Sequence, residues 1–326
     1  MLMATPRLTI AGIIPVYNQR ATLAEAVDSA LNQTRPADEI IVVDDGSTDG
    51  SGDLVAQRYG DRVQLIRQKN GGAPVAFNTG IRASHSDLVS LLGADDGWMP
   101  DRIEKQGAFM EAHPSCMLSF TAAVLKDEVN NRVSVEGNVV DKETYLRRDF
   151  FQERLLPAGN GVMVRRAVFD DVGYFDESLR KCQDTDMWLR IMIKYGFEHI
   201  PEPLVWVRRG PHRTEPDMSK WFRYHELYFA KHRHTFGRGW RGQIVWRRGY
   251  SSVLRKEAIW YFQHNMGGKA LAKVAKSVVV WPLFDSTVTF KRGLEWLLGP
   301  QVYSGAVATF RRLLRRPRRE PADGNR

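Results

Sequence analysis

Two pairs of adjacent aspartates are the residues of this sequence that are best suited to chemistry. The pair Asp44-Asp45 follows the apolar run 40–43, and the pair Asp95-Asp96 comes shortly after the apolar segment 87–92. Neighbouring carboxylates repel each other, and burial raises that cost unless a cation or hydrogen-bond donors face them. Carboxylates at the end of a strand can hold Mg²⁺ or Mn²⁺, hard ions that also coordinate substrate phosphates. We therefore predict a divalent metal site at residues 95–96.

Both pairs also have simpler interpretations, which the sequence leaves open. Ser47 or Asp49 could cap a helix that begins near Gly50, because serine and aspartate are preferred at helix starts. Asp96-Gly97 could be an ordinary turn, since both residue types favour turns. Two carboxylates directly after an apolar strand are costly unless they are used, so the site interpretation is favoured.

Strands and helices alternate through the first 112 residues. The runs 8–16, 39–43, 63–66 and 87–92 predict strands, and 20–33, 50–59, 73–83 and 100–112 predict helices. The alternation is typical of βαβ units, which predicts an α/β fold with a Rossmann-like, mostly parallel sheet flanked by helices. Ligands of such sheets bind at the carboxyl ends of the strands. Three polar clusters, Tyr17-Asn18, Asp44-Asp45 and Asp95-Asp96, follow predicted strands, so we expect them to meet in one crevice.

The pattern becomes less regular after about residue 115 and changes again near 215. Segments 116–120 and 199–209 predict strands, and a helix is expected to start at Asp184. Beyond 215, the stretches 219–234, 250–263, 267–281 and 301–316 predict helices, many of them rich in arginine and aromatic residues. We therefore divide the chain into an α/β domain, 1–215, and a basic, mainly helical C-terminal extension, 216–326.

Charge is distributed unevenly along the chain. Residues 1–205 hold 22 Lys and Arg against 30 Asp and Glu, a net of −8, and residues 206–326 hold 25 against 8, a net of +17, which together give +9. A basic half can bind nucleic acid, an anionic membrane surface or a phosphorylated substrate. The apolar run 278–284 is too short to span a bilayer. With the basic residues around it, this run suits either peripheral membrane contact or packing on the α/β domain.

The two cysteines, Cys116 and Cys182, are too few for a disulfide framework, and neither has a histidine at a metal-ligand spacing. We predict that both are reduced core residues. The first residues lack the long apolar segment of a signal peptide. The expected location is therefore the cytoplasm, or the inner face of the cell membrane if the basic extension contacts lipid.

Two phosphate-binding signatures are absent. No Gly-x-Gly-x-x-Gly follows the first predicted strand, which disfavours a dinucleotide dehydrogenase, and there is no Walker loop ending in Gly-Lys-Ser/Thr. A divalent cation held by carboxylates is another way to bind phosphate. The sequence therefore favours a metal over a glycine-rich loop as the phosphate-binding device.

Five motifs occur in a fixed order within residues 10–190: IPVYNQ at 14–19, VVDDGSTD at 42–49, ADDGWMP at 94–100, GYFDESL at 173–179 and QDTDMWLR at 183–190. In this order they resemble the family 2 glycosyltransferases, which have the GT-A fold. The resemblance implies that residues 1–215 are an inverting, metal-dependent catalytic domain. Such a domain moves a sugar from a UDP-, GDP- or dTDP-type donor to a hydroxyl of a carbohydrate or lipid-linked acceptor, in polysaccharide, cell-envelope or glycolipid synthesis.

The resemblance also implies roles for individual residues. The donor would be bound by Pro15, Tyr17, Asn18, Asp45, Asn78 and Asp95, with Tyr17 and Asp45 at the nucleoside. Mg²⁺ or Mn²⁺ would be held by Asp95 and Asp96. His212 would complete that site or touch the diphosphate, unless it is an exposed loop histidine. Asp184 would be the general base, although the same residue could be only the N-cap of its helix.

Two positions depart from the family's pattern. Gly93 stands where an aspartate often begins the metal motif, and Gln183 stands where a glutamate often precedes the base. Both changes remove a charge, the first from the metal motif and the second from beside Asp184. Two residues after that base, Asp186 is expected to be only a charge at the helix start, which the helix dipole favours.

Two other functions stay open on the sequence alone. A nucleotidyltransferase acting on a sugar phosphate would also place paired carboxylates on an α/β sheet. It usually carries a glycine-rich, basic loop after the first strand, and residues 15–23 contain no glycine. A nucleic-acid-binding protein would account for the basic half but leaves the acidic clusters unexplained. We therefore expect a nucleotide-sugar donor and no nucleic-acid partner.

Overall fold

The computed structural model describes residues 7–136, 159–210, 218–235 and 239–281, and every statement below refers to these ranges. The chain divides into two compact units, Met1–His232 and Arg233–Arg326. Helix α8 (Met218–Lys231) belongs to the first unit. The boundary predicted from the sequence, at residue 215, precedes this helix, whereas the boundary found from the contacts follows it.

The first unit begins with alternating strands and helices. In chain order these are β1 (Ile10–Val16), α1 (Arg20–Leu31), β2 (Glu39–Asp44), α2 (Ser51–Tyr59), η1 (Gly60–Arg62), β3 (Gln64–Arg67), α3 (Ala73–Ala83), β4 (Leu88–Leu91), β5 (Gly97–Trp98) and α4 (Arg102–Ala112). Every strand and helix predicted in this part is present, with its ends within two residues of the predicted ones. The two-residue strand β5 was not predicted from the sequence, because so short a strand carries no hydrophobic period.

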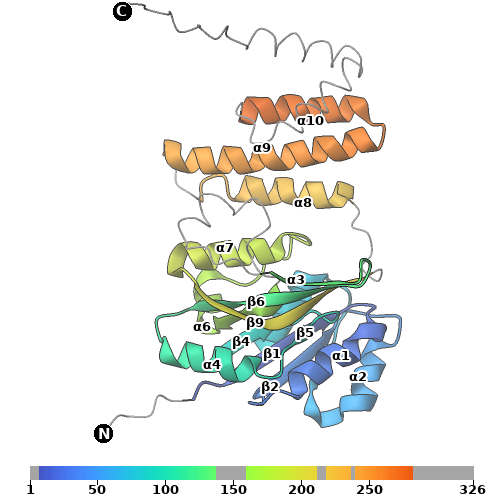
Figure 1. The fold of residues 1–326 in the computed structure, drawn as a ribbon, viewed down its shortest axis with the longest axis vertical. Coiled ribbons are helices and arrows are strands. Elements are labelled where there is room, and N and C mark those ends of the chain that lie inside the picture. The colour runs from blue at the N-terminus through green and yellow to red at the C-terminus, as the bar shows by residue number, and fades with distance from the viewer. Residues whose placement is uncertain (1–6, 137–158, 211–217, 236–238, 282–326) are drawn as a thin grey trace, which may run out of the picture. The chain divides into compact units, whose positions relative to one another are not determined.

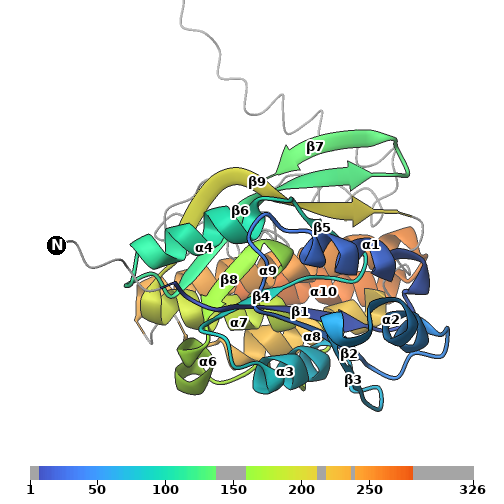
Figure 2. The ribbon, with the colours of Figure 1, turned by 90° about the horizontal axis from the view of Figure 1, so that it is seen from below.

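The remainder of the first unit is less regular. It contains β6 (Leu118–Asp127), β7 (Arg132–Glu136), η3 (Gly159–Gly161), β8 (Val162–Arg165), α6 (Ala167–Val172), α7 (Gln183–Tyr195), β9 (Glu198–Arg209) and α8. The predicted strands at 116–120 and 199–209 correspond to β6 and β9, and the helix expected at Asp184 is α7. Figure 1 and Figure 2 show these elements around one central sheet.

The central sheet has the strand order β3-β2-β1-β4-β8-β6-β9-β5, with β7 paired to β6. Neighbours among β1, β2, β3 and β4 pair in parallel, as does β6 with β9, whereas β8 runs antiparallel to both β4 and β6. Helices α1 and α4 lie on one side of β1 and α3 on the other (Figure 2). The predicted Rossmann-like α/β fold is confirmed, in a mixed sheet whose first four strands are parallel.

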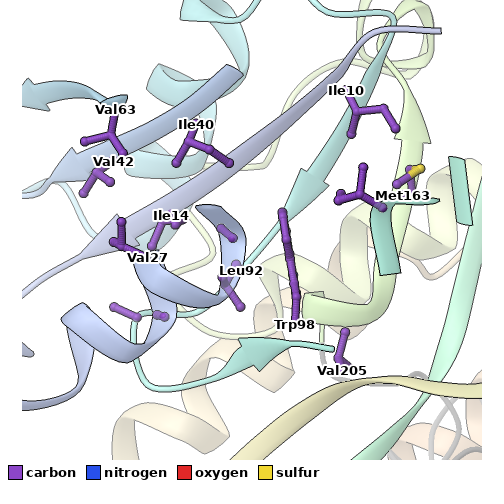
Figure 3. Close-up of a cluster of buried hydrophobic side chains, with 14 of the residues drawn as sticks. Ile10, Ile14, Val27, Ile40, Val42, Val63, Leu92, Trp98, Met163 and Val205 are labelled. Carbon is purple, nitrogen blue, oxygen red and sulfur yellow. The ribbon is translucent and has the colours of Figure 1, made fainter. Parts of the chain in front are cut away.

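The core explains why these strands read as continuous apolar runs. Ile40 and Val42 of β2 join a buried cluster with Ile14 of β1, Val27 of α1 and Trp98 of β5 (Figure 3). The residues between them on β2 are also buried, although they face the opposite side of the sheet. A parallel strand covered on both faces needs apolar residues at every position, which is what hides the period of two.

The second unit contains a pair of packed helices, α9 (Trp240–Gln263) and α10 (Gly267–Val280). The buried carboxylate of Glu257 pairs with Lys273 at 2.8 Å, and the hydroxyl of Ser251 donates to the carbonyl of Ser277 at 2.9 Å. Both helices were predicted, but α9 begins ten residues before its predicted start at 250. No helix within the described residues is long and apolar enough to cross a membrane. The predicted helix at 301–316 lies outside the described residues.

Candidate active site

The loops that follow β1 and β2 are joined by hydrogen bonds at the carboxyl end of the sheet. Asn18 adopts a left-handed backbone conformation with φ of 52°. Its N–H donates to the hydroxyl of Ser47 at 3.1 Å, and its side-chain carbonyl accepts the N–H of Thr48 at 2.8 Å. Asparagine is one of the few residues that enter this conformation easily. The loop 17–18 is therefore fixed against the Gly-Ser-Thr turn of the second motif.

The side chains of Asp44 and Asp45 have different hydrogen-bond partners, so the two carboxylates do not share one site. Asp44 accepts the N–H of Ser47 at 2.9 Å, and its other oxygen lies against Gly52 in the first turn of α2, where a β-carbon would come within 2.1 Å of it. Asp45 accepts the amide of Gln68 at 2.7 Å and the N–H groups of Gly71 and Gly72 at 2.9 and 2.8 Å. Donors facing both buried carboxylates offset the cost of ending a strand on two charges.

Asp49 accepts hydrogen bonds from the first residues of two helices, although the N-cap residue of α2 is Gly50. One of its oxygens accepts the N–H and the hydroxyl of Ser51 at 3.0 and 2.6 Å, and the other accepts the N–H of Arg20 at 2.9 Å. Although partial burial raises the pKa of Asp49, the hydrogen bonds from Ser51 and Arg20 outweigh it, and the pKa lies below its usual value. One carboxylate therefore stabilises the starts of both α1 and α2.

Asp96 is buried in the loop after β4 and is held by two remote parts of the chain. The amide of Asn160 in η3 donates to one of its oxygens, and the N–H of Arg208 in β9 donates to the other at 2.8 Å. The carbonyl of the Asn160 side chain in turn accepts the N–H of Gly93 at 2.6 Å. Asp96 thus fixes the loop after β4 against η3 and β9.

Asp95, its neighbour, lines a cavity of about 560 Å³ in the first unit. The lining is completed by Asn18, Gln19, Arg20, Ala21, Thr22, Asp49, Arg208 and Gly210. These residues come from the ends of β1, β4 and β9 and from the starts of α1 and α2, so the cavity lies where an open α/β sheet binds its ligands. Its size is within the range of small-molecule sites. Of the two adjacent aspartates, Asp95 is the one positioned at this cavity.

The oxygen atoms around Gly93 test whether a divalent cation fits. Asp95 Oδ1, Asp96 Oδ2 and Asn160 Oδ1 lie 3.1, 3.0 and 3.3 Å from the point that a β-carbon on Gly93 would occupy. Oxygen donors of this kind suit Mg²⁺ or Mn²⁺, which commonly take one or two carboxylates and complete their shell with water and substrate phosphates. Within the described residues no cluster of three or more His, Cys, Asp or Glu side chains could hold a metal. Beside Gly93 the described residues thus offer two carboxylates and one amide as oxygen donors for such an ion.

Asp184 lies in the first turn of α7. Its Oδ1 accepts the N–H of Thr185 at 2.8 Å. The partial positive charge at a helix start favours an ionised carboxylate there. Asp184 is not among the residues that line the 560 Å³ cavity. The orientation of the Asp184 carboxylate therefore depends on how helix α7 is positioned.

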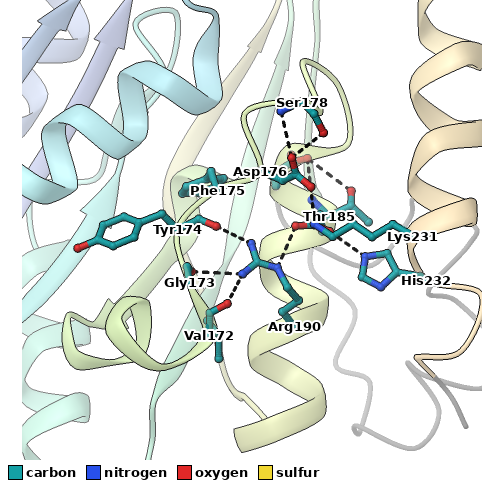
Figure 4. A network of polar contacts seen from close by, with 12 residues as sticks. Val172, Gly173, Tyr174, Phe175, Asp176, Ser178, Thr185, Arg190, Lys231 and His232 are labelled. Carbon is teal, nitrogen blue, oxygen red and sulfur yellow. Dashed lines mark hydrogen bonds and ion pairs between the residues drawn. The ribbon is translucent and has the colours of Figure 1, made fainter.

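Asp186, expected to be only a charge at the helix start, is fully buried at the centre of an ion-pair network, so that expectation was incomplete. Its Oδ2 accepts Nε of Arg190 at 2.9 Å, and its Oδ1 accepts Nζ of Lys231 at 2.7 Å and Nε2 of His232 at 2.8 Å (Figure 4). Burial raises the pKa of this carboxyl, but the bonds from His232 and Lys231 outweigh it, and the pKa is lowered. Asp186 thus ties helix α7 to the end of α8.

The same network extends to the loop before α7. The guanidinium of Arg190 donates to the carbonyls of Val172, Gly173 and Tyr174 (Figure 4). Lys231 also donates to Asp176 at 2.6 Å. Although burial raises the pKa of Asp176, the bonds from Lys231 and Ser178 lower it to about 2. The GYFDESL motif is therefore a structural brace for α7.

A second connection joins this brace to the β1–β4 side of the sheet. The buried amide of Asn78 in α3 donates to the carbonyl of Phe175 and to Glu177, both at 2.9 Å, and its oxygen accepts the N–H of Phe175 at 2.9 Å. The loop that Asp45 holds also reaches this region, because the side chain of Arg180 lies 3.7 Å from the β-carbon position of Gly72. Helix α3 and the loop that Asp45 holds are thus both in contact with the segment before α7.

The structure brings some of the predicted site residues together and separates others. Asn18 and Asp95 share the cavity, Tyr17 beside them is 49% exposed, and Asp96 lies directly behind Asp95. Asp45 follows β2 and supports the loops of the site. Pro15 lies in β1, where it pairs with Val43. Asn78 and Asp184 lie in the α3–α7 region, and His212 is outside the described residues.

Other residues at the site were not identified by their position in the sequence. Asn160 and Arg208 hold Asp96, and Lys231 and His232 hold Asp186. The side chain of Arg208 also pairs with Glu25 and with Glu128, the latter at 3.2 Å. No local motif marks these residues, since each acts on a partner that is remote in the sequence.

Comparison with known proteins relates this chain to glycosyltransferases. The family model described as "Glycosyl transferase family 2" matches residues 13–173. An uncharacterized glycosyltransferase of Rickettsia conorii is 34% identical over 187 residues, which is 55% of this chain but only 30% of that protein. The chain thus spans less than a third of the length of that relative.

A shorter relative is aligned over most of its own length. TuaG of Bacillus subtilis, named for teichuronic acid biosynthesis, is 31% identical over 233 residues, covering 67% of this chain and 89% of TuaG. Among solved structures, residues 1–349 of TarS from S. aureus superpose with a TM-score of 0.58 at 16% identity, over 97% of this chain and 95% of that one. The likeness to TarS establishes the fold.

Proposed function

Because the chain belongs to glycosyl transferase family 2, we propose that it is an inverting glycosyltransferase that moves a sugar from a nucleotide diphosphate donor to an acceptor hydroxyl. The observation that carries this proposal is that the adjacent residues Asp95 and Asp96 have different surroundings. Asp96 is committed to Asn160 and the Arg208 backbone, whereas Asp95 lines the cavity beside the β1 loop. A carboxylate held at such a point is suited to a nucleotide-sugar diphosphate and its metal ion.

The donor occupies the cavity between the loops after β1 and β2 and the start of α1. Asn18 and Asp95 line it, Tyr17 is exposed beside it, and Asp45 keeps the supporting loops in place. Asp95 would hold the Mg²⁺ or Mn²⁺ ion, with Asp96 as its neighbour in the same loop. When bound, that ion supplies positive charge where the leaving diphosphate gains negative charge.

Asp184 acts as the general base. The acceptor hydroxyl loses its proton to this carboxylate as its oxygen bonds to the anomeric carbon, and the bond to the diphosphate breaks on the opposite face. One base without a second carboxylate nucleophile is sufficient for inversion. The position of Asp184 at the start of α7 favours the ionised form that accepts the proton.

The donor and acceptor classes are suggested by the relatives. TarS has been solved in complex with UDP-GlcNAc, and this supports testing UDP-sugars first. TuaG is named for the synthesis of teichuronic acid, which supports a polysaccharide or other cell-envelope acceptor. We infer a cytoplasmic reaction on a carbohydrate or lipid-linked acceptor.

A donor screen tests this function directly. UDP-, GDP- and dTDP-sugars are measured for thermal stabilisation and slow hydrolysis, each with Mn²⁺ and with a chelator. We expect one donor class to stabilise the protein only when the metal is present. Asp95→Ala should remove that stabilisation, whereas Asp61→Ala should keep it, because Asp61 is an exposed residue outside the cavity. Absence of stabilisation and hydrolysis with every donor and metal would overturn the proposal.

Peripheral membrane contact through the basic C-terminal region is a separate part of the proposal. The chain carries 19 Lys and Arg against 5 Asp and Glu from residue 233 onward, a net of +14, which favours anionic lipid. Deletion of residues 301–326 should shift the protein from the membrane fraction to the supernatant. An unchanged distribution would remove this part without affecting the catalytic proposal.

A further inference from the structure

Two fully buried polar side chains on α4 contact the segment that holds the loop after β4. Arg102 and Gln106 lie about one helical turn apart on α4, and both are 0% exposed. Neither belongs to one of the five motifs, since the third motif ends at Pro100. Glutamine is mostly exposed in proteins, and arginine is almost never fully buried unless it is paired. The bonds that these two side chains make therefore indicate what they do.

Gln106 connects α4 to η3 and to β6. Its amide nitrogen donates to the carbonyl oxygen of Gly161 in η3 and to the hydroxyl of Ser119 in β6, both at 3.1 Å. Gly161 is itself close to β6, because a β-carbon on it would lie 3.1 Å from Oγ1 of Thr121. The amide of Gln106 thus fixes η3 against this strand.

Arg102 connects α4 to β4 and β8. Its Nη2 donates to the hydroxyl of Ser90 in β4 at 2.6 Å and to the carbonyl oxygen of Val162 in β8 at 3.2 Å. The hydroxyl of Ser90 donates to the same carbonyl at 2.9 Å. Val162 directly follows η3, so Arg102 and Gln106 hold two consecutive carbonyl groups of one short segment.

The guanidinium of Arg102 is energetically unfavourable in this place. Within the described residues no carboxylate pairs with it, and its Nε and Nη1 atoms are buried without a hydrogen-bond partner. Burial lowers the pKa of Arg102 to about 9, because water that stabilises the charged form is excluded. Replacement of a buried ionic group by an apolar one is often neutral or stabilising. Arg102 is therefore better explained by the segment that it holds than by the stability of the core.

The segment that α4 holds is the one that positions the loop after β4. Asn160 in η3 precedes Gly161, and its amide donates to Asp96 while its carbonyl accepts the N–H of Gly93 at 2.6 Å. Asp95, which lines the cavity, belongs to the same loop. A displacement of η3 would therefore break or shift both bonds of Asn160 and move the carboxylate of Asp95.

We propose that Arg102 and Gln106 are positioning residues, which act through η3 and Asn160 to hold Asp95 at the cavity. The consequence for the metal and the donor rests on the proposed function. The order of the loop does not rest on it, because the loop is held by hydrogen bonds within the chain. The two are therefore measured separately.

The order of the loop is measured by amide hydrogen exchange on the full chain without ligand. Gln106→Met has a side chain of similar length and removes the bonds to Gly161 and Ser119. We expect the peptide that contains Gly93 to exchange about fivefold faster in this variant, the factor that corresponds to the loss of one hydrogen bond. Exchange reports this change because the bond between Gly93 and Asn160 must open first.

Gln33→Met is the matched control. Gln33 is also buried, and its side chain donates to the carbonyls of Ser29 and Met99 and accepts the N–H of Ile103, but it makes no bond to η3. Both substitutions thus remove buried hydrogen bonds that reach α4 or the residues just before it. Only Gln106→Met should accelerate exchange at Gly93.

The consequence for the site is measured as the Mn²⁺ concentration that gives half of the thermal stabilisation by UDP, GDP or dTDP, whichever stabilises the wild type. We expect Gln106→Met and Arg102→Met to need at least about tenfold more Mn²⁺, as is found for residues that orient metal ligands. Gln33→Met should need the same concentration as the wild type. Arg102→Lys keeps the charge and a donor, so it should recover part of the loss.

The outcomes separate the two parts. Unchanged exchange at Gly93 in Gln106→Met would overturn the proposal, as would an equal acceleration in Gln33→Met. Faster exchange with an unchanged Mn²⁺ requirement would also overturn it, because the loop would then be ordered without positioning the metal ligand. If Gln106→Met fails to fold, Arg102→Lys is compared with the wild type in the same two measurements. Absence of any nucleotide effect in the wild type would count against the proposed function, and the exchange rates would still decide whether α4 orders the loop.

Discussion

The two sides of the site hold their buried carboxylates in different ways. On the β1–β4 side, Asp44, Asp45 and Asp49 are held mainly by backbone N–H groups of nearby turns. On the α7–α8 side, Asp186 is held by the side chains of Arg190, Lys231 and His232. Backbone donors are neutral and leave the local charge negative, whereas charged side chains cancel it.

The difference explains what each side can do. The cavity is lined by the carboxylates of Asp49 and Asp95 and by the guanidinium groups of Arg20 and Arg208, so groups of both signs face a bound ligand. A carboxylate neutralised by ion pairs cannot bind a metal, but it can hold two helices together. The first arrangement suits binding, and the second suits positioning of Asp184, which lies one helical half-turn from Asp186.

The largest expected effect is the loss of sugar transfer when the proposed base Asp184 is replaced. Asp184→Asn keeps the size of the side chain but cannot accept the acceptor proton, so transfer should fall by about 10²- to 10⁴-fold. Donor binding, measured by thermal stabilisation with nucleotide and Mn²⁺, should not change. Asp170→Asn, an exposed position on α6, serves as the matched control. Full transfer by the Asp184 variant would remove this residue from its assigned role.

The next largest effect tests the ion-pair brace. Asp186→Ala leaves Arg190, Lys231 and His232 without their common partner, and we expect a loss of about 3–5 kcal/mol in the free energy of unfolding. Urea unfolding followed by tryptophan fluorescence measures it. Asp171→Ala, which breaks the exposed contact to Lys194, should change stability little. Equal stability of the two variants would mean that the buried network does not brace α7.

A smaller effect distinguishes the two adjacent aspartates. Asp96→Ala leaves the buried amide of Asn160 and the N–H of Arg208 without an acceptor, which should cost about 1–3 kcal/mol of stability and weaken both donor binding and transfer. Asp95→Ala should cost less stability than Asp96→Ala, because Asp95 lines the cavity, and it should lose the metal-dependent effect of the donor. Unfolding curves and donor-dependent melting shifts measure both. Reversed behaviour of the two variants would exchange their roles.

The smallest effect is on the pH dependence of stability. Because the pKa of Asp176 is lowered to about 2 in the folded protein, its contribution is present above the unfolded value near 3.8 and is lost as pH falls toward 2. Asp176→Asn should therefore reduce the loss of stability between pH 4 and pH 2 by about 1–2 kcal/mol. Asp61→Asn is the control. Identical slopes in wild type and Asp176→Asn would show that Lys231 does not stabilise this carboxylate.

Local patterns were sufficient for the β1–β4 side. Its strands, helices and the convergence of the loops after β1, β2 and β4 follow from apolar runs of the right length and from the rule that parallel strands bring their carboxyl ends to one edge. Of the carboxylate pairs expected in the crevice, Asp95 lines the cavity, whereas Asp44 and Asp45 do not. The partners of Asp45 and Asp49 lie within about 30 residues, at the starts of α1 and α2 and in the turn before α3.

Local patterns were insufficient for the α7–α8 side. Asp186 looks like an ordinary helix-start charge until Lys231 and His232 arrive from a helix more than 40 residues later. The same packing brings His225 to Cys182, and no spacing in the sequence marks that pair. Side chains on separate helices are matched by packing, which a one-dimensional pattern does not encode.

The sequence by itself determined the alternation of strands and helices, the sheet edge where the motifs gather and the family to which they belong, because short-range periodicity and turn chemistry are written locally. Only the tertiary structure decided that Asp95 lines the cavity while Asp96 is a brace, and that Asp186 is neutralised by α8. Those assignments depend on Asn160, Arg208 and Lys231, which reach their partners only after the chain has folded.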